Sequence, residues 1–366
     1  MKFIIEKKNF LIPLQKISSL LIRNNPNEIL GNILIEIDQK NIFLTSTNTE
    51  IELMYKISNN YSCIPGKITV SGRKILEIFR IISEKSLIYV KLIKKKLYLS
   101  SQKSKFCLLT ISAKKFPYFK KKKYKRKFYI KQKTLKNMLE YIYFSMSSQD
   151  IRPYLNGIFI EFKKKYIKSI ATNGHRMAIF KKKNTKKYPK FSIILPRKSV
   201  IELLKIINHE KILVKILYDK NYIQFHINNI IFTSKLINNN FPNLDHILIK
   251  EKKYQIKINV KKLKKSLSHV SILVHEQSKG IYLKLKKNQC KITSHNQEEK
   301  SEYTFNIEYK YPQTLKLSLN INYLLDVLNV LKCDFITFIL DEKIQYLQIE
   351  VPNKPELKYI ILPLYL

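Results

Sequence analysis

The hydrophobic positions of this chain repeat three times. Near the N-terminus, apolar residues first alternate and then recur at spacings of three and four, at Phe3, Ile5, Phe10, Leu14 and Ile17. Alternation predicts a short strand, and the longer spacing predicts an amphipathic helix. The pattern returns at Phe128, Ile130, Leu135, Leu139 and Ile142, and again at Ile256, Ile258, Leu263, Leu267 and Val270. The chain therefore contains three copies of one unit.

The copies stay in step after the first helix. A second strand is predicted at 33–37, 158–162 and 281–285, a polar turn at 45–48, 172–174 and 293–296, and a second helix at 76–82, 201–207 and 325–331. The first two copies close with Phe116-Pro117 and Phe241-Pro242. Each copy has the size of one domain. We predict an α+β fold of three tandem domains, in which two helices pack on antiparallel sheets, with boundaries at 1–125, 126–253 and 254–366.

Composition excludes several classes of protein. Hydrophobic residues make up 45% of the 366 positions, which is too many for a disordered chain. No uncharged apolar run approaches the roughly 20 residues of a membrane helix. Glu6, Lys7 and Lys8 interrupt the position where a signal peptide needs an apolar core, so we expect a cytoplasmic protein.

The four cysteines are far apart in the sequence, and each lies in an apolar pattern. We interpret them as reduced core residues, and we expect no disulfide, no metal and no cofactor. They are Cys63, Cys107, Cys290 and Cys333.

The formal net charge is +42. Lys, Ile and Asn are abundant while Gly occurs 6 times and Trp 0 times, which is typical of an AT-rich coding sequence. Part of the lysine excess is therefore mutational drift. A charge of this size still attracts polyanions and indicates a nucleic-acid partner. The basic run at 120–127 could be a nuclear address or a disordered basic arm. We interpret it as a charged linker because it falls where a domain ends.

Two polar segments in the second copy differ from the surrounding pattern. Residues 149–157 form a loop rich in polar side chains, and Thr172 to Met177 (TNGHRM) form a tight turn with a hydroxyl, an imidazole and a guanidinium. Asn-Gly is also the ordinary choice for a hairpin turn because both residues tolerate positive φ. The turn is either a simple hairpin or a contact surface.

A catalytic interpretation of these segments is poorly supported. His175, Arg176, Asp150 and Arg152 could be drawn as a nuclease acid–base set. A nuclease needs clustered carboxylates for Mg²⁺, and Asp150 lies among basic residues. Phosphate-loop, nucleophile-elbow and zinc motifs are lacking in the sequence. We predict no catalytic residue and no enzymatic activity.

The sequence resembles the bacterial DNA polymerase III beta subunit, the replicative sliding clamp. The resemblance rests on the length, the threefold repeat and six segments: 149–157, 172–177, Pro196-Arg197-Lys198, 232–236 (FTSKL), 323–329 (YLLDVLN) and the apolar tail 360–366. It implies a homodimer that closes head to tail into a six-domain ring around duplex DNA. Such a ring tethers a polymerase and gives processive DNA replication.

The resemblance also implies three sets of site residues. For sequence-independent contact with DNA they are Arg23, Asn24, Arg73, Gln149, Pro153, Tyr154 and Arg197. For a pocket that binds short apolar peptides they are Leu155, Thr172, Gly174, His175, Arg176, Met177, Pro242, Ile247, Tyr323, Ile360, Leu362, Pro363 and Leu364. For the dimer interface they are Phe106, Leu108, Ile272 and Leu273.

The peptide partners implied are the polymerase alpha subunit, the clamp loader, and other polymerases and repair proteins. Two alternatives remain open. The four interface residues could pack inside their own domains. The whole chain could also be a basic nucleic-acid-binding scaffold that forms no ring.

Overall fold

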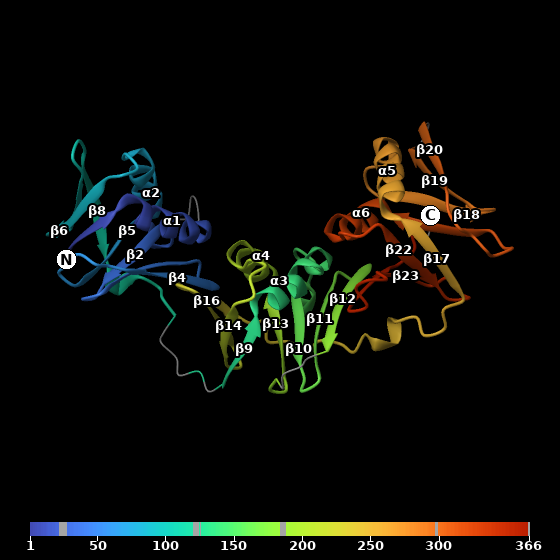
Figure 1. Ribbon diagram of the computed structural model, residues 1–366, viewed down its shortest axis with the longest axis horizontal. Helices are drawn as coiled ribbons and strands as arrows, with labels where there is room; N and C mark the ends of the chain where they lie inside the picture. Colours follow the sequence, from blue (N-terminus) through green and yellow to red (C-terminus); the bar gives the residue numbers. More distant parts are fainter. Residues whose placement is uncertain (22–27, 120–123, 125, 184–187, 297–298, 365–366) are drawn as a thin grey trace. The chain divides into compact units, whose positions relative to one another are not determined.

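Strands and helices follow the same order three times along the chain (Figure 1). The computed structural model describes residues 1–21, 28–119, 124, 126–183, 188–296 and 299–364. The predicted residues Arg23 and Asn24, and most of the basic run 120–127, lie outside these residues. The predicted α+β class with three tandem repeats is confirmed.

Each repeat has the order strand, helix, four strands, helix, three strands. The first contains β1 (Lys2–Glu6), α1 (Lys7–Ile17), β2 (Asn32–Ile37), β3 (Asn41–Thr47), β4 (Ile51–Ser58), β5 (Gly66–Ser71), α2 (Gly72–Ile81), β6 (Leu87–Ile93), β7 (Lys96–Ser100) and β8 (Lys105–Ser112). The second contains β9 (Arg126–Lys131), α3 (Gln132–Glu140), β10 (Gly157–Phe162), β11 (Tyr166–Thr172), β12 (Arg176–Lys183), β13 (Phe191–Pro196), α4 (Arg197–Ile206), β14 (Leu213–Tyr218), β15 (Tyr222–Ile227) and β16 (Ile230–Lys235). The third contains β17 (Tyr254–Asn259), α5 (Val260–Val270), β18 (Gly280–Lys286), β19 (Gln289–Asn296), β20 (Glu299–Asn306), β21 (Leu315–Asn320), α6 (Ile321–Val330), β22 (Phe335–Leu340), β23 (Leu347–Glu350) and β24 (Leu357–Ile361).

The chain divides into two compact units, residues 1–136 with 201–236, and residues 137–200 with 237–366. Within the described residues, the first unit holds a 12-stranded sheet in the order β1-β6-β7-β8-β5-β2-β3-β4-β16-β15-β14-β9. The second unit holds an 8-stranded sheet, β13-β10-β11-β12-β24-β23-β22-β17, and a 4-stranded sheet, β20-β19-β18-β21. The domain boundaries predicted near 125 and 253 follow the sequence repeat and stay a prediction.

Two strand pairings join neighbouring repeats through backbone hydrogen bonds. In the first unit, β4 pairs with the last strand of the second repeat, and Phe232 lies opposite Leu53. In the second unit, β12 pairs with the last strand of the third repeat, and Met177 lies opposite Ile360. The fourth strand of one repeat is therefore covered by the last strand of the next.

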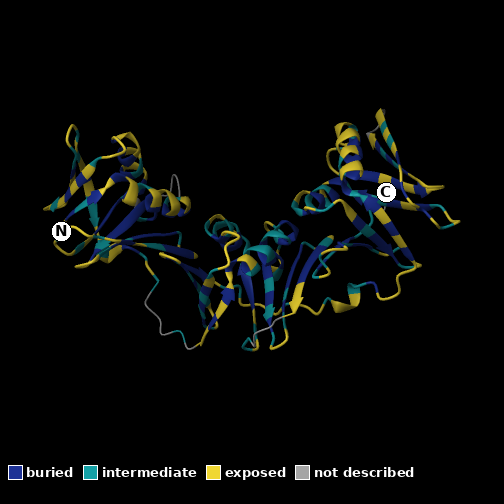
Figure 2. Ribbon diagram, viewed as in Figure 1, coloured by how far each residue is buried: buried dark blue, intermediate teal, exposed yellow. Residues whose placement is uncertain are grey.

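The helices pack in pairs against the sheets. In the first unit α1 and α2 lie side by side (Figure 1). The ring of Phe10 stacks on that of Phe79, with 4.5 Å between the ring centres. The buried amine of Lys7 donates to the carbonyl oxygens of Arg80 and Ile82, which close α2. The helix faces turned toward the strands are the buried ones (Figure 2), as an amphipathic pattern requires. In the second unit α5 and α6 form the equivalent pair.

The predicted turns of the first and third repeats are wrong by a few residues. Thr45 to Thr47 lie in β3, and Thr293 to Asn296 end β19. The cause is burial: Ser46 and Ser294 point inward, and each hydroxyl donates to the last carbonyl of the first helix of its repeat, at 2.6 and 2.9 Å. These polar side chains cap a helix from inside a strand.

The interpretation of all four cysteines as core residues is also wrong. Cys290 is buried, but Cys107 is exposed on β8, and Cys63 and Cys333 are half-buried. Alternation in β8 turns Cys107 away from Leu108, which faces the core. Across the described residues, no three His, Cys, Asp or Glu side chains are grouped so that they could hold a metal ion. No described helix has the length and apolar character needed to cross a membrane.

A buried carboxyl group lies where β4 meets β16. Glu52 is opposite Thr233, and its Oε2 accepts the backbone N–H of Phe119 at 2.7 Å. Burial raises the pKa of Glu52 from 4.5 to about 7. The folded state therefore binds more protons than the unfolded state between these values, and stability falls as the pH rises through them.

The substitution Glu52→Gln keeps the acceptor and removes the titration. We expect the wild-type free energy of unfolding to fall, relative to that of the variant, by about 2 kcal/mol between pH 5.5 and pH 8. Urea unfolding followed by circular dichroism at both pH values measures this difference. Equal pH dependence of the two proteins would contradict the assigned pKa of Glu52.

Candidate functional site: an apolar pocket beside a polar turn

The turn between β11 and β12 is held by its own side chains. Thr172 Oγ1 donates to the carbonyl of Arg176 at 2.7 Å and accepts the N–H of Gly174 at 3.1 Å. Asn173 Oδ1 accepts the N–H groups of His175 and Arg176 at 3.1 and 3.0 Å. Gly174 has a φ of 91°, which side-chain-bearing residues rarely adopt. The residue types of the turn are thus required by its geometry.

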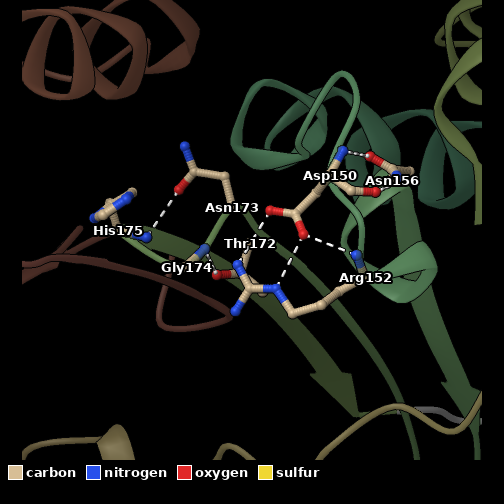
Figure 3. Close-up of polar contacts among 7 residues, drawn as sticks. All are labelled: Asp150, Arg152, Asn156, Thr172, Asn173, Gly174 and His175. Carbon is tan, nitrogen blue, oxygen red and sulfur yellow. Dashed lines mark hydrogen bonds and ion pairs between the residues drawn. The ribbon is translucent and has the colours of Figure 1, made fainter.

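The loop before β10 faces this turn (Figure 3). Asp150 Oδ1 accepts from the N–H and Nε of Arg152 at 2.9 and 3.0 Å, and the side-chain amide of Asn156 bonds both backbone groups of Asp150 at 2.8 Å. The Arg152 guanidinium lowers the pKa of Asp150 to about 2. This carboxyl group stays ionised at neutral pH, so it cannot act there as a general acid.

Between these segments lies a mainly apolar pocket inside the second unit. Its lining residues are Arg152, Tyr154, Leu155, Thr172, Gly174, Arg176, Met177, Pro242, Leu244, Ile247, Ile360 and Leu362. The β12–β24 ladder brings Met177 and Ile360 together at its floor. An apolar floor with a few polar groups at the rim suits a short hydrophobic peptide.

Arg176 joins the pocket to α6. Its Nη1 donates to Asp326 at 2.6 Å, and Nη2 donates to the carbonyl of Phe144. The guanidinium carbon lies 4.6 Å from the centre of the Tyr323 ring. Because it is paired on three sides, Arg176 acts as a support for the pocket wall.

Most of the residues proposed for the peptide pocket are brought together. Four of them do not line it. His175 is exposed, and its carbonyl accepts the N–H of Leu362 at 2.9 Å. Tyr323 lies behind Arg176. Pro363 and Leu364 follow β24, where the N–H of Leu364 donates to Ser318 at 2.7 Å.

Three lining residues were missing from the predicted pocket. Arg152 was considered only for the poorly supported nuclease set, and Tyr154 was predicted to contact DNA. The Tyr154 ring meets that of Phe241 edge-on at 6.0 Å. No local pattern singled out Leu244, because it lies in a connecting segment whose described structure contains only the 3₁₀ turn Asp245–Ile247.

Within the described part of the chain, the residues proposed for DNA contact lie on helices and on the loop before β10. Arg73 is exposed on α2 and pairs with Glu77 at 2.9 Å. Gln149 and Pro153 are exposed. Arg197, the first residue of α4, is half-buried and donates to the carbonyl of Met146 at 3.0 Å.

The residues proposed for the dimer interface lie on β8 and in the turn that follows α5. Phe106 and Leu108 are two residues apart and share the core-facing side of β8. Ile272 and Leu273 belong to a 3₁₀ turn, Ser271–Leu273, that follows α5. Ile272 is 79% exposed.

Comparison with known proteins agrees with this architecture. Family models of the DNA polymerase III beta subunit match residues 1–120 (N-terminal domain), 129–243 (central domain) and 245–365 (C-terminal domain). The chain is 43% identical to the beta sliding clamp of Buchnera aphidicola subsp. Rhopalosiphum padi, with 99% of each chain covered. It is 32% identical to that of Escherichia coli strain K12, with 100% of each covered.

Solved structures give the same result. The DNA polymerase III beta subunit of Pseudomonas aeruginosa superposes with a TM-score of 0.96 at 29% identity, over 100% of both chains. A second structure of that clamp, with a TM-score of 0.95 at 29% identity and the same full coverage, is bound to griselimycin. The matches support a sliding clamp and not the open scaffold. By its three repeats, its sheet topology and its full-length similarity, the chain belongs to the DNA polymerase III beta subunit family, the beta sliding clamps.

Proposed function

We propose that two copies of this chain close head to tail into a cytoplasmic ring around duplex DNA, and that the pocket holds partner proteins on that ring. A ring that cannot leave DNA sideways keeps a weakly bound polymerase at high effective concentration near the primer end. The ring would carry six domains, with boundaries at residues 1–125, 126–253 and 254–366. A sliding clamp is an accessory subunit of a polymerase and not an enzyme.

The observation that carries the ring proposal is an unpaired strand edge at each end of the repeat series. Within the described residues, β20 pairs only with β19, although its equivalents β4 and β12 are each covered by the last strand of the next repeat. Residues 105–109 of β8 pair only with β7. Exposed edges are templates for a further strand. A second copy supplies β8 for β20, and β20 for β8.

The position on β20 follows from equivalent residues. Phe232 lies opposite Leu53, and Leu53 lies opposite Ser46. In the third repeat Ser301 lies opposite Ser294, which bonds the end of α5 as Ser46 bonds the end of α1. Ser301 is therefore the equivalent of Leu53, and it is the residue that the equivalent of Phe232 should face.

That equivalent on β8 is Phe106. Ile111, five residues after Phe106, lies opposite Thr69 of β5. Ile237, five residues after Phe232, donates its N–H to Ile194 of β13. Ile194 holds the same position in the second repeat as Thr69 holds in the first. Phe106 also shares the core-facing side of its strand with Leu108. With Phe106 opposite Ser301, the preceding Lys105 faces Glu302 and the following Cys107 faces Lys300.

Large apolar side chains are exposed near these edges. Leu109 on β8 is 76% exposed and Ile272 after α5 is 79% exposed. Isolated exposed apolar residues are common, but these two lie next to unpaired backbone, where burial against a second copy stabilises both. Leu109 is therefore added to the proposed interface residues, which are Phe106, Leu108, Ile272 and Leu273.

Contact with DNA would come from basic helix faces and from the proposed residues Arg23, Asn24, Arg73, Gln149, Pro153, Tyr154 and Arg197. Exposed basic residues occur on the helices at Lys16, Arg73, Arg80, Lys133, Lys205 and Lys261. Helix α6 carries no Lys or Arg. Phosphate contacts of this kind bind without reading sequence, as sliding requires.

The pocket would accept short apolar peptides from the polymerase alpha subunit, the clamp loader, and other polymerases and repair proteins. Its lining supports this: Leu155, Met177, Ile360 and Leu362 supply apolar surface, and Arg152 lies at the edge. We propose that griselimycin, which is bound in a related structure, occupies this pocket.

The register of ring closure can be tested with a cysteine. Because Cys107 and Lys300 are expected to be cross-strand neighbours, Lys300→Cys should form a disulfide with Cys107 of a second copy on mild oxidation. A covalent dimer is expected on non-reducing gels. The control Thr304→Cys, four residues along the same strand, should stay monomeric on the gel. Equal cross-linking of both variants would contradict the register.

The pocket can be tested with griselimycin. Leu362→Asp introduces a carboxylate at the pocket wall, so the dissociation constant measured by calorimetry should rise about tenfold or more. Leu213→Asp changes an equally apolar but exposed residue of β14 in the first unit and serves as the control. If both variants bound griselimycin like the wild type, the ligand would not occupy this pocket.

A further inference from the structure

One wall of the pocket is built by a segment without regular pairing. Residues 240–248 connect β16 to β17 and contain only the 3₁₀ turn Asp245–Ile247. Leu244 and Ile247 line the pocket and pack on a buried cluster that includes Ile170 and Met177. The shape of the pocket therefore depends on where this segment lies.

Backbone hydrogen bonds do not attach the segment to the sheet. Among the described residues, the one backbone bond made by 240–248 is internal, from the N–H of Ile247 to the carbonyl of Leu244 at 3.2 Å. Hydrogen bonds anchor the residues on either side of it. The N–H of Ile237 donates to Ile194 of β13, and the N–H of Ile249 donates to the side chain of Gln348. Side chains must hold the residues between these anchors.

Apolar packing and, among the described residues, one polar side-chain contact attach the segment to the sheet. Phe241 stacks on Phe159 of β10 at 4.5 Å between ring centres. At the turn itself, Lys168 Nζ donates to Asp245 Oδ1 at 2.5 Å. Stacking fixes the start of the segment, and the ion pair fixes the turn that carries Leu244 and Ile247.

The ion pair joins a lysine on β11 to the connecting segment 240–248. Lys168 lies on β11, on the same side as Ile170 and Thr172, and its side chain is 12% exposed. Asp245 is 62% exposed. The hydrogen bond from Lys168 lowers the pKa of Asp245, and Lys181 and Lys163 add to the effect. Because its pKa is lowered from a value that is already acidic, the Asp245 carboxylate is ionised at neutral pH.

Two further carboxylates are paired with arginines that line the pocket. Asp150 binds Arg152 and fixes the loop before β10, and Asp326 binds Arg176 and fixes α6. Each pair therefore belongs to one side of the pocket. The third side has Lys168 and Asp245, which are 77 residues apart in sequence.

We propose that the Lys168–Asp245 ion pair positions the Leu244–Ile247 wall and thereby sets the affinity of the pocket for apolar ligands. Neither of the two residues lines the pocket, so they act as positioning residues. The inference rests on the proposed peptide-binding function. It adds that ligand affinity is controlled from outside the lining, by a contact between a strand and a connecting segment.

The test measures griselimycin binding by calorimetry. Asp245→Asn should weaken binding about fivefold, because the wall loses its charged attachment while its apolar contacts remain. Lys168→Asp alone should weaken it further through repulsion of Asp245. Combining Lys168→Asp with Asp245→Lys should restore most of the wild-type affinity, which simple destabilisation would not do.

Lys181→Gln is the matched control, because Lys181 acts on Asp245 only through its charge and should leave affinity near the wild-type value. Unchanged binding by Asp245→Asn, or no rescue by the exchanged pair, would overturn the inference. If the wild type and Leu362→Asp differed as expected while Asp245→Asn matched the wild type, the pocket would stand and only the positioning role would fail. No griselimycin binding by the wild type would contradict both proposals.

Discussion

The architecture depends on the need of a β-strand edge to be paired. In each repeat the fourth strand, β4, β12 or β20, has one edge that no described strand of its own repeat pairs with. The backbone donors and acceptors of such an edge can pair with another strand. In the first two cases the last strand of the next repeat supplies those partners. In the proposed ring, β20 and β8 pair with a second copy. Ring closure is, in this account, the third use of a pairing that the chain already makes twice.

The same pairing builds the pocket. Strands β12 and β24 are separated by about half the chain, and their ladder sets Met177 opposite Ile360 and leads the chain on to Leu362. The pocket floor is thus backbone-anchored, whereas its wall at 240–248 is held by side chains. A wall held by side chains on a backbone-anchored floor agrees with the proposed binding of several related peptides at one site.

The repeats and their helices were predictable because apolar periodicity reports directly on burial. Phe10, Leu135 and Leu263 are all fully or almost fully buried, as their spacing indicated. The polar turns were harder, since Ser46 and Ser294 serve as buried caps for helix ends in the folded chain. A Ser or Thr in the sequence looks the same whether its hydroxyl points into the core or lies in a turn.

The pocket residues were predicted from the family resemblance and not from the hydrophobic pattern. Its lining residues are drawn from distant segments, so local spacing cannot bring Leu155, Pro242 and Leu362 together. The Lys168–Asp245 pair was invisible in the sequence for the same reason, because one lysine among many gave no sign of its partner. Cys107 was misjudged because β8 alternates between two environments.

The central claim is topological, and a sealed ring tests it most directly. Lys300→Cys protein is equilibrated with nicked circular DNA and then oxidised, so that both junctions are covalently closed. The account predicts protein that stays with the circle in denaturant and is released when one restriction cut linearises the DNA. Protein that washes off the intact circle as readily as off linear DNA, despite complete cross-linking, would contradict encirclement.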